Sequence, residues 1–153
     1  MAYVSKKIKE WIEFSLSRAK KDNPGRVKER EEQYSAHLLD TGWHWGEWIE
    51  PDWNGFIKTE DPGGAYLQDI YNHGAPEVCT AHLSYGCYIA SQIADILGKK
   101  AEAEYFYEMR RLTKLAYRET CVENGRMKNK RQCDYVHAIM FDMLSEKEKK
   151  NAC

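Results

Sequence analysis

The sequence predicts an all-α protein built from antiparallel helical hairpins. Apolar residues recur at three- and four-residue spacing over four long segments, which is the pattern of an amphipathic helix. No segment alternates apolar and polar residues at period two, and Val is scarce. Gly98 separates two of the helical segments by only a few residues. Because so short a link makes neighbouring helices pack antiparallel, these two segments are expected to form a hairpin.

The first helix is predicted over residues 3–21. Its apolar residues share one helical face, and Lys and Glu fill the other; the apolar set is Val4, Ile8, Trp11, Ile12, Leu16 and Ala19. The Asn23-Pro24-Gly25 triplet ends this helix, because proline cannot continue it. Residues 26–35 are mostly charged and are expected to form a solvated connector or a short exposed helix.

Residues 43–53 form the most unusual stretch, because they hold four of the five tryptophans of the chain. Three carboxylates, Glu47, Glu50 and Asp52, lie among them. The stretch is too aromatic for an ordinary solvent loop and too interrupted for a regular helix or strand. An indole ring can cover the C–H face of a pyranose while a nearby carboxylate accepts hydrogen bonds from the hydroxyls. The composition therefore fits a sugar site, although residue types alone equally allow tryptophans that plug a helical core.

The residues that follow the tryptophans favour the sugar site. Turn signals such as Asn54-Gly55 and Asp61-Pro62 predict about twenty residues of loop that end near Ala75. A loop of this length inside a compact chain is uncommon unless it is functional. The loop length therefore supports a binding site over a core plug.

The second helix is predicted from Pro76 to Leu97, with Pro76 and Glu77 suited to its first turn. It carries two apolar stripes: one is Leu83, Cys87, Ala90, Ile93, Ala94 and Leu97, and the other is Tyr85, Tyr88, Ile89 and Ile96. A helix that is apolar on two faces is usually covered on both, so this helix is expected to be central. Gly98 fits the left-handed position that ends a helix.

The third helix is predicted from Ala101 to Thr120. Its apolar residues are Tyr105, Phe106, Met109, Leu112, Leu115 and Ala116. Residues 123–126, Glu-Asn-Gly-Arg, form a predicted turn.

Two capping boxes predict the last helices. Asn129 and Gln132 have the spacing that starts a fourth helix, which is expected to end at Leu144. Its predicted apolar face is Cys133, Val136, Met140, Met143 and Leu144. Ser145 and Glu148 form the second capping box, and few residues follow it. The chain is therefore expected to be a slice of a longer domain.

Composition excludes several classes of function. The 153 residues carry a net charge of −1, so there is no basic face and nucleic-acid binding is not expected. No apolar run approaches the roughly 20 residues of a membrane span, and no membrane association is expected. The start of the chain lacks the apolar region of a signal peptide, and the compartment stays open.

The cysteines and histidines show no metal-binding spacing. The five cysteines form no CxxC pair and are expected to be reduced: Cys79, Cys87, Cys121, Cys133 and Cys153. The histidines His37, His73, His82 and His137 are expected to pack or to lie at the surface. No cofactor and no metal ion is predicted.

The segment from Leu38 to Pro51, LLDTGWHWGEWIEP, resembles the Gly-Asp/Glu-Trp segment of the bacterial α-L-rhamnosidases. Residues 76–82 resemble the opening of the next helix of their catalytic domain. Further similarities follow in order at residues 93–99, at residues 124–126 and from Gln132 onward. The resemblance covers the chain from about residue 35 to its end, and the tryptophan segment is its most specific part.

The resemblance implies inverting hydrolysis of terminal α-L-rhamnose by a toroid of six helical hairpins, with a rhamnose-containing glycan as substrate. Residues 1–153 would then be a single domain, a middle slice of this α/α toroid. In the family the general acid lies upstream, in a motif rich in Asp, Arg and Glu, and the general base lies downstream. Neither motif is found here; Lys28-Glu29-Arg30-Glu31-Glu32 lacks the aspartates. No catalytic residue is assigned to this chain, and the isolated chain is expected to be inactive.

The resemblance also implies which residues bind the sugar. Glu47 matches the Asp or Glu of the family segment and would accept hydrogen bonds from hydroxyls, and Trp48 would provide the stacking surface. Trp45, Asp52 and Trp53 are neighbouring candidates without a firm family match. For Glu50 and His44, hydrogen bonds that stabilise the loop are the favoured role.

Two alternatives remain. One is another glycan-processing α/α toroid that acts on a different sugar. The other is a helical-repeat interaction module, because the helix at residues 101–116 and its preceding Leu-Gly resemble a tetratricopeptide pair; no second copy follows at about 34 residues. Quenching of tryptophan fluorescence by sugars would favour a glycan site, and binding of peptides would favour the repeat module.

An incomplete toroid would leave helix faces uncovered. Six apolar residues are expected to be exposed in this way and to promote a homodimer or a larger assembly: Trp11, Ile12, Tyr85, Tyr88, Ile89 and Ile96.

Overall fold

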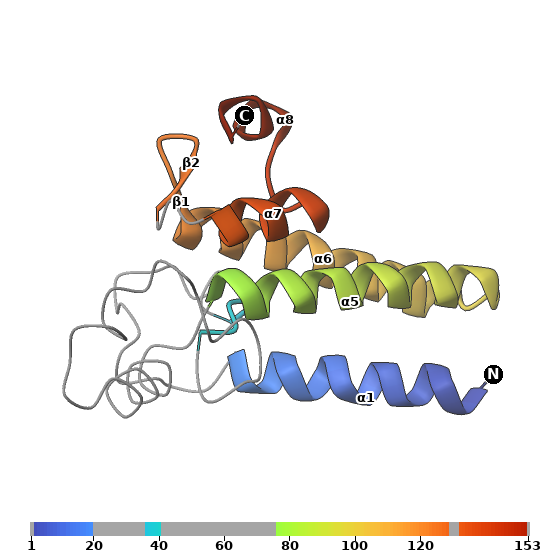
Figure 1. Ribbon diagram of the computed structural model, residues 1–153. Coiled ribbons are helices and arrows are strands. Elements are labelled where there is room, and N and C mark those ends of the chain that lie inside the picture. The colour runs from blue at the N-terminus through green and yellow to red at the C-terminus, as the bar shows by residue number, and fades with distance from the viewer. Residues whose placement is uncertain (1, 20–35, 41–75, 129–131, 153) are drawn as a thin grey trace.

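The computed structural model describes residues 2–19, 36–40, 76–128 and 132–152. Its helices are α1 (Ala2–Ala19), α5 (Pro76–Ile96), α6 (Lys100–Cys121), α7 (Gln132–Met140) and α8 (Glu146–Ala152), and its strands are β1 (Val122–Glu123) and β2 (Arg126–Met127) (Figure 1). The predicted all-α class is confirmed, because these two short strands are the only sheet among the described residues. The helices predicted at residues 76–97 and 101–120 agree with α5 and α6 to within one residue.

Helix α5 occupies the centre of the described fold, as predicted. It lies between α1 on one side and α6 and α7 on the other (Figure 1), and it packs against all three. The first of its two predicted stripes is buried at Leu83, Cys87, Ala90 and Ala94. The second stripe remains partly exposed, as expected for an uncovered face, and Ile96 keeps 84% of its surface.

The link between α5 and α6 is the predicted glycine stop. Gly98 has φ +70°, and no atom lies within 4 Å of the position where a Cβ would stand. The N–H of Gly98 donates to the carbonyl of Asp95 at 2.9 Å, and the N–H of Lys99 donates to that of Ala94 at 2.8 Å. This pair of bonds is the Schellman motif, which satisfies carbonyls at the end of α5 and turns the chain into α6.

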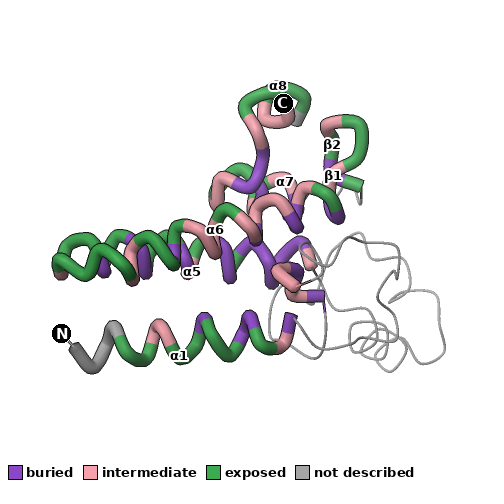
Figure 2. The backbone as a smooth tube through the Cα atoms, turned by 180° about the vertical axis from the view of Figure 1, so that it is seen from behind, coloured by how far each residue is buried: buried purple, intermediate pink, exposed green. Residues whose placement is uncertain are grey.

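Helix α1 packs on α5 through a buried stripe that Figure 2 shows on the side facing α5. Ile12, Leu16 and Ala19 are buried there, whereas Trp11 is 49% exposed. The expected exposure of Trp11 is therefore confirmed, and that of Ile12 is wrong, because Ile12 points into the α1–α5–α6 core. A Cβ on Gly86 would stand 2.8 Å from the Trp11 ring, so this glycine allows the close approach of the two helices.

The predicted turn at residues 123–126 joins β1 and β2 into a hairpin. Val122 pairs with Met127 and Glu123 with Arg126. Asn124 and Gly125 have φ +52° and +76°, the left-handed pair that a two-residue type I′ turn requires. Strands of two residues are too short to show alternation, which is why the sequence pattern did not reveal them.

Helix α7 differs most from the prediction. It ends at Met140 and not at Leu144, because Asp142 adopts φ +56° and a second Schellman pair forms from Asp142 to Ile139 and from Met143 to Ala138. Met143 and Leu144 are buried after this reversal and not along the helix.

The predicted apolar face of this helix is wrong at two of its members, Val136 and Met140. Val136 and Met140 are 49% and 71% exposed, while Asp134 and Ala138 are the buried residues of the helix. Asn129, the predicted cap of this helix, lies outside the described residues.

Candidate functional site

Three buried carboxylates from separate parts of the chain lie at one end of the helical layers. Asp40 belongs to the short segment 36–40, Glu77 to the first turn of α5 and Asp134 to the first turn of α7. Figure 1 shows this segment beside the start of α5, and α7 starting on the same side near the β-hairpin. These three residues, Asp40, Glu77 and Asp134, are called the carboxylate end. Carboxylates are rarely buried unless they are paired or hydrogen-bonded, so the fold supplies partners for them.

The segment 36–40 is fixed to α5 by a buried contact. The backbone N–H of Leu39 donates to Oγ1 of Thr80 at 3.0 Å, and both Thr80 and Leu38 are fully buried. Asp40 directly follows Leu39, and Pro76 is the first residue of α5. The chain therefore leaves the described structure and returns to it at the same place, the carboxylate end.

The residues predicted to bind sugar fall between these two attachment points. Glu47, Trp48, Trp45, Asp52 and Trp53 all lie outside the described residues, as do His44 and Glu50. The structure therefore positions the two flanks of the tryptophan segment and leaves its members as predictions.

Tyr117 connects the carboxylate end to the β-hairpin. Burial raises the pKa of its phenol, and the neighbouring Cys121, Glu77 and Asp134 raise it further, so the group stays neutral. Its hydroxyl donates to Sδ of Met127 at 3.9 Å, and the N–H of Met127 donates to the hydroxyl of Tyr135 at 3.3 Å. These contacts join α6, the hairpin and the start of α7.

The carboxylate end was not visible in the sequence. Glu77 was expected to favour the helix dipole and Asp134 had no predicted role, because acidic residues in a first turn usually face solvent. Tyr117 was likewise missed, although it follows the predicted core residue Ala116 in a helix with a broad apolar face.

Two of the described cysteines, Cys79 and Cys87, have thiols that are unreactive at neutral pH. Burial raises the pKa of both Cys79 and Cys87 to about 12, while Arg18 acts in the opposite direction on Cys79 and Arg110 on Cys87. Thiolates are the nucleophiles and metal ligands, so these two thiols serve as packing groups. No disulfide links the four cysteines that the structure describes.

The described part of the chain has neither a metal-binding cluster nor a membrane-spanning helix. Within it, no group of three or more His, Cys, Asp or Glu side chains is arranged to hold a metal ion. None of the helices described is long and apolar enough to cross a membrane.

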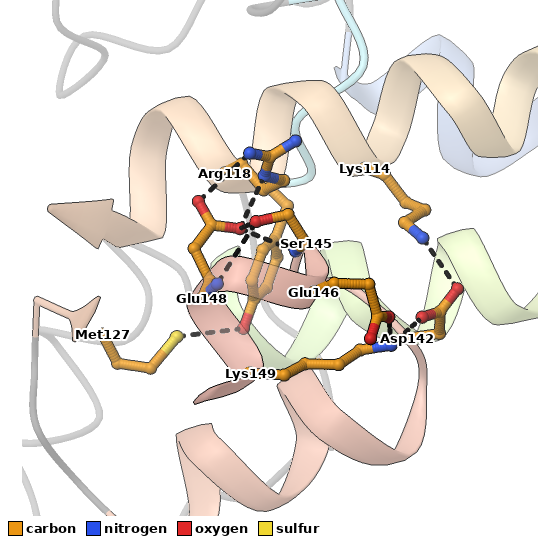
Figure 3. A network of polar contacts seen from close by, with 9 residues as sticks. Lys114, Arg118, Met127, Asp142, Ser145, Glu146, Glu148 and Lys149 are labelled. Atoms are coloured by element: carbon orange, nitrogen blue, oxygen red, sulfur yellow. Dashed lines mark hydrogen bonds and ion pairs between the residues drawn. The ribbon is translucent and has the colours of Figure 1, made fainter. Parts of the chain in front are cut away.

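A second polar site joins α8 and the end of α7 to α6 (Figure 3). Asp142 accepts from Nζ of Lys114 at 2.8 Å, from Nη2 of Arg110 at 3.1 Å and from Nζ of Lys149 at 2.8 Å. Burial opposes ionisation of Asp142, but the hydrogen bonds from Lys114 and Lys149 outweigh it and lower the pKa to about 2. The carboxylate is therefore charged at neutral pH.

The neighbouring carboxylate, Glu148, completes the predicted capping box of α8. Its side chain accepts from the backbone N–H of Ser145 at 2.7 Å, and the backbone N–H of Glu148 donates to Oγ of Ser145 at 3.3 Å. Arg118 of α6 binds it with two nitrogens, at 2.9 and 3.1 Å. Burial opposes the lowering of its pKa, yet the bonds from Ser145 and Arg118 hold the pKa below the usual value. Both carboxylates thus act as anchors between helices.

Comparisons with known proteins agree with the arrangement of helical hairpins. The family model described as the bacterial alpha-L-rhamnosidase 6 hairpin glycosidase domain matches residues 6–153. An alpha-L-rhamnosidase of Formosa agariphila is 31% identical over 75 residues, which cover 48% of this chain and 8% of that protein. The chain thus matches only a small part of the length of this relative. No solved structure matches the chain.

Proposed function

The chain belongs to the bacterial α-L-rhamnosidase six-hairpin glycosidase family, and we propose that it supplies part of the sugar-binding wall of an enzyme that hydrolyses terminal α-L-rhamnose. The observation that carries the proposal is the attachment of residues 41–75 at the carboxylate end. Leu39 is bound to Thr80 on one side of this segment, and Pro76 opens α5 on the other. The segment that contains the tryptophans and carboxylates therefore leaves and re-enters the described fold at the end where Asp40, Glu77 and Asp134 are buried.

Within this wall, Glu47 accepts hydrogen bonds from the sugar hydroxyls and Trp48 stacks against the C–H face of the ring. Trp45, Asp52 and Trp53 extend the same surface. The support is the residue content of the segment and its similarity to the family segment. An amphipathic ring beside a charged acceptor suits a ligand that has one apolar face and a rim of hydroxyls.

The catalytic step belongs to groups outside this chain. Inversion requires an acid that protonates the glycosidic oxygen and, on the opposite face, a base that takes a proton from the attacking water, with the two carboxyl groups roughly 6.5–9.5 Å apart. Neither family motif occurs in the 153 residues. The buried carboxylates of the carboxylate end position the binding wall and take no proton from substrate.

The test of the wall uses a complete six-hairpin domain that contains this sequence. Glu47→Gln and Trp48→Ala are each expected to lower kcat/KM for an aryl α-L-rhamnoside at least about tenfold, or about 1.4 kcal/mol of transition-state stabilisation. Glu104→Gln and Phe14→Ala are matched controls, because both side chains are exposed and lie on helices α6 and α1. Unchanged kinetics in both wall variants, with folding intact, would refute the assignment.

A separate test concerns the chain alone. Residues 1–153 are expected to show no turnover of an aryl α-L-rhamnoside, because the acid and the base are missing, while rhamnose still quenches tryptophan fluorescence. Measurable turnover by the purified chain would mean that the catalytic carboxyl groups lie within it.

A further inference from the structure

A pocket of about 670 Å³ lies between α5, α6 and the turn that follows α7. It exists because α7 ends at Met140, where Asp142 reverses the chain, while α5 and α6 continue beyond that point (Figure 1). None of Asp40, Glu77 and Asp134 lines this pocket, so the pocket is distinct from the carboxylate end. Its volume falls in the range of small-molecule sites.

The pocket has an excess of positive charge. Four cationic side chains of α6 line it, Arg110, Arg111, Lys114 and Arg118, against the single carboxylate of Asp142. That carboxylate is already shared by three cations, because Arg110, Lys114 and Lys149 all bind it. Three of the cations have further carboxylate partners: Glu108 binds Arg111, Glu148 binds Arg118 and Glu146 binds Lys149. Among the described residues, these five cations and four carboxylates leave one positive charge in excess, which an anion would neutralise.

Arg111 has donors to offer. Among the described residues it is bound only to Glu108 on the same helix, in a pair that is about half exposed on both sides. Exposed pairs of this kind contribute little, so Arg111 can exchange Glu108 for a ligand at small cost.

Three tyrosines line the pocket together with the cations. Tyr85 and Tyr88 belong to α5 and Tyr107 to α6, and the guanidinium of Arg110 lies 4.2 Å from the ring centre of Tyr88. Tyr85 stacks on Phe141 with ring centres 4.9 Å apart, which fixes its orientation. Tyr107 is 65% exposed. Tyrosine rings beside cationic side chains suit a flat molecule that bears a negative charge at one edge.

We propose that this pocket binds a small aromatic oxyanion, an aromatic carboxylate above all. The ring lies against the tyrosines, and the carboxylate oxygens accept from Arg111 and Lys114. The planar guanidinium of Arg111 matches the two oxygens of a carboxylate, which is why that anion is favoured. The site is independent of the proposed sugar wall, since the two share no residue.

The experiment is a calorimetric titration of the chain with benzoate, benzamide and inorganic phosphate at low salt. Benzoate is expected to bind saturably, benzamide at least about tenfold more weakly because it lacks the charge, and phosphate more weakly because it lacks the ring. Equal binding of benzoate and benzamide would overturn the role of the cations. Phosphate binding as tight as that of benzoate would overturn the role of the ring, and absence of benzoate binding at millimolar concentration would overturn the site.

Substitutions give a signature that a purely structural role would not produce. Arg111→Gln and Tyr107→Ala, both at exposed side chains, are expected to weaken benzoate about fivefold or more, whereas Arg126→Gln on the hairpin leaves it unchanged. Asp142→Asn is expected to strengthen benzoate binding, because it removes the competing carboxylate, and asparagine tolerates the left-handed φ of this position. Circular dichroism confirms the fold of each variant. Weaker or unchanged binding in folded Asp142→Asn would contradict the proposal.

Discussion

At the scale of single residues, the fold determines which thiols can react. Cys79 and Cys87 are buried in α5, and burial raises the pKa of each to about 12. A group whose pKa is raised stays protonated until the pH approaches that value, so neither thiol forms a thiolate at neutral pH.

This leads to a prediction about alkylation. In the folded chain, Cys79 and Cys87 should react with iodoacetamide far more slowly than a cysteine in a peptide, and their reaction should accelerate only toward strongly alkaline pH. After denaturation without reductant, mass spectrometry should count five alkylated thiols. A mass that reveals a disulfide between any two cysteines would contradict the expectation that all five are reduced.

The residue scale also shows where sequence reasoning reached its limit. Leu83, Cys87 and Ala90 were predicted as core because helical spacing alone places them on one face. The burial of Asp40 and Asp134 could not be predicted in this way, since it depends on neighbours contributed by distant parts of the chain. The residues proposed to bind sugar were identified by a resemblance, and both their role and their geometry stay predictions.

At the scale of elements, α8 depends on two carboxylates. Asp142 and Glu148 bind cations of α6, and both have a pKa below the ordinary values of 3.8 and 4.5. Burial opposes this lowering, and hydrogen bonds to Lys114, Lys149, Ser145 and Arg118 exceed it. A carboxyl group with a lowered pKa stabilises the folded chain fully above its unfolded pKa, and this contribution is lost as the pH falls through the folded pKa.

The chain should therefore lose stability on acidification from about pH 5 toward pH 2, in the interval set by these two groups. Urea unfolding, followed by circular dichroism at a series of pH values, measures the effect. The double variant Asp142→Asn, Glu148→Gln should be less stable than the parent at pH 7 and should show a flatter dependence below pH 5. An equally steep dependence in the double variant would assign the effect to other carboxylates.

Element boundaries followed the sequence where a local signal marked them. Gly98 ended α5 and Ser145 began α8 through bonds between near neighbours, and both were predicted. The end of α7 was missed because it depends on Asp142 in a left-handed conformation, which few residues other than glycine adopt. Three cations from other helices hold its side chain there, and local sequence does not reveal them.

At the scale of the whole molecule, α5 presents an apolar face that the described residues cover only in part. Tyr85, Tyr88, Ile89 and Ile96 remain partly exposed along it. Apolar patches larger than a few hundred Å² are rare on monomers in solution, and a two-fold pairing of identical faces is the commonest way to cover them.

The isolated chain is therefore expected to self-associate at micromolar concentration. Ile96→Lys should shift the assembly toward the monomer without loss of stability, because Ile96 is 84% exposed and supports little of the core. Val136→Lys on α7 is the matched control, being exposed but outside the α5 stripe. Sedimentation velocity distinguishes the species, and a clean monomer of the unmodified chain would refute the expectation.

The attachment of the chain at Asp40 and at Pro76 also bears on how the segment between them can vary. Both attachment points lie at the same end of α5, fixed by the Leu39–Thr80 bond and by the start of the helix. The closure entropy of a flexible connection rises by only about 0.6 kcal/mol for each doubling of its length. Insertions between Asp40 and Pro76 are therefore expected to cost the described helices little, so the proposed sugar wall can vary while the helical frame is kept.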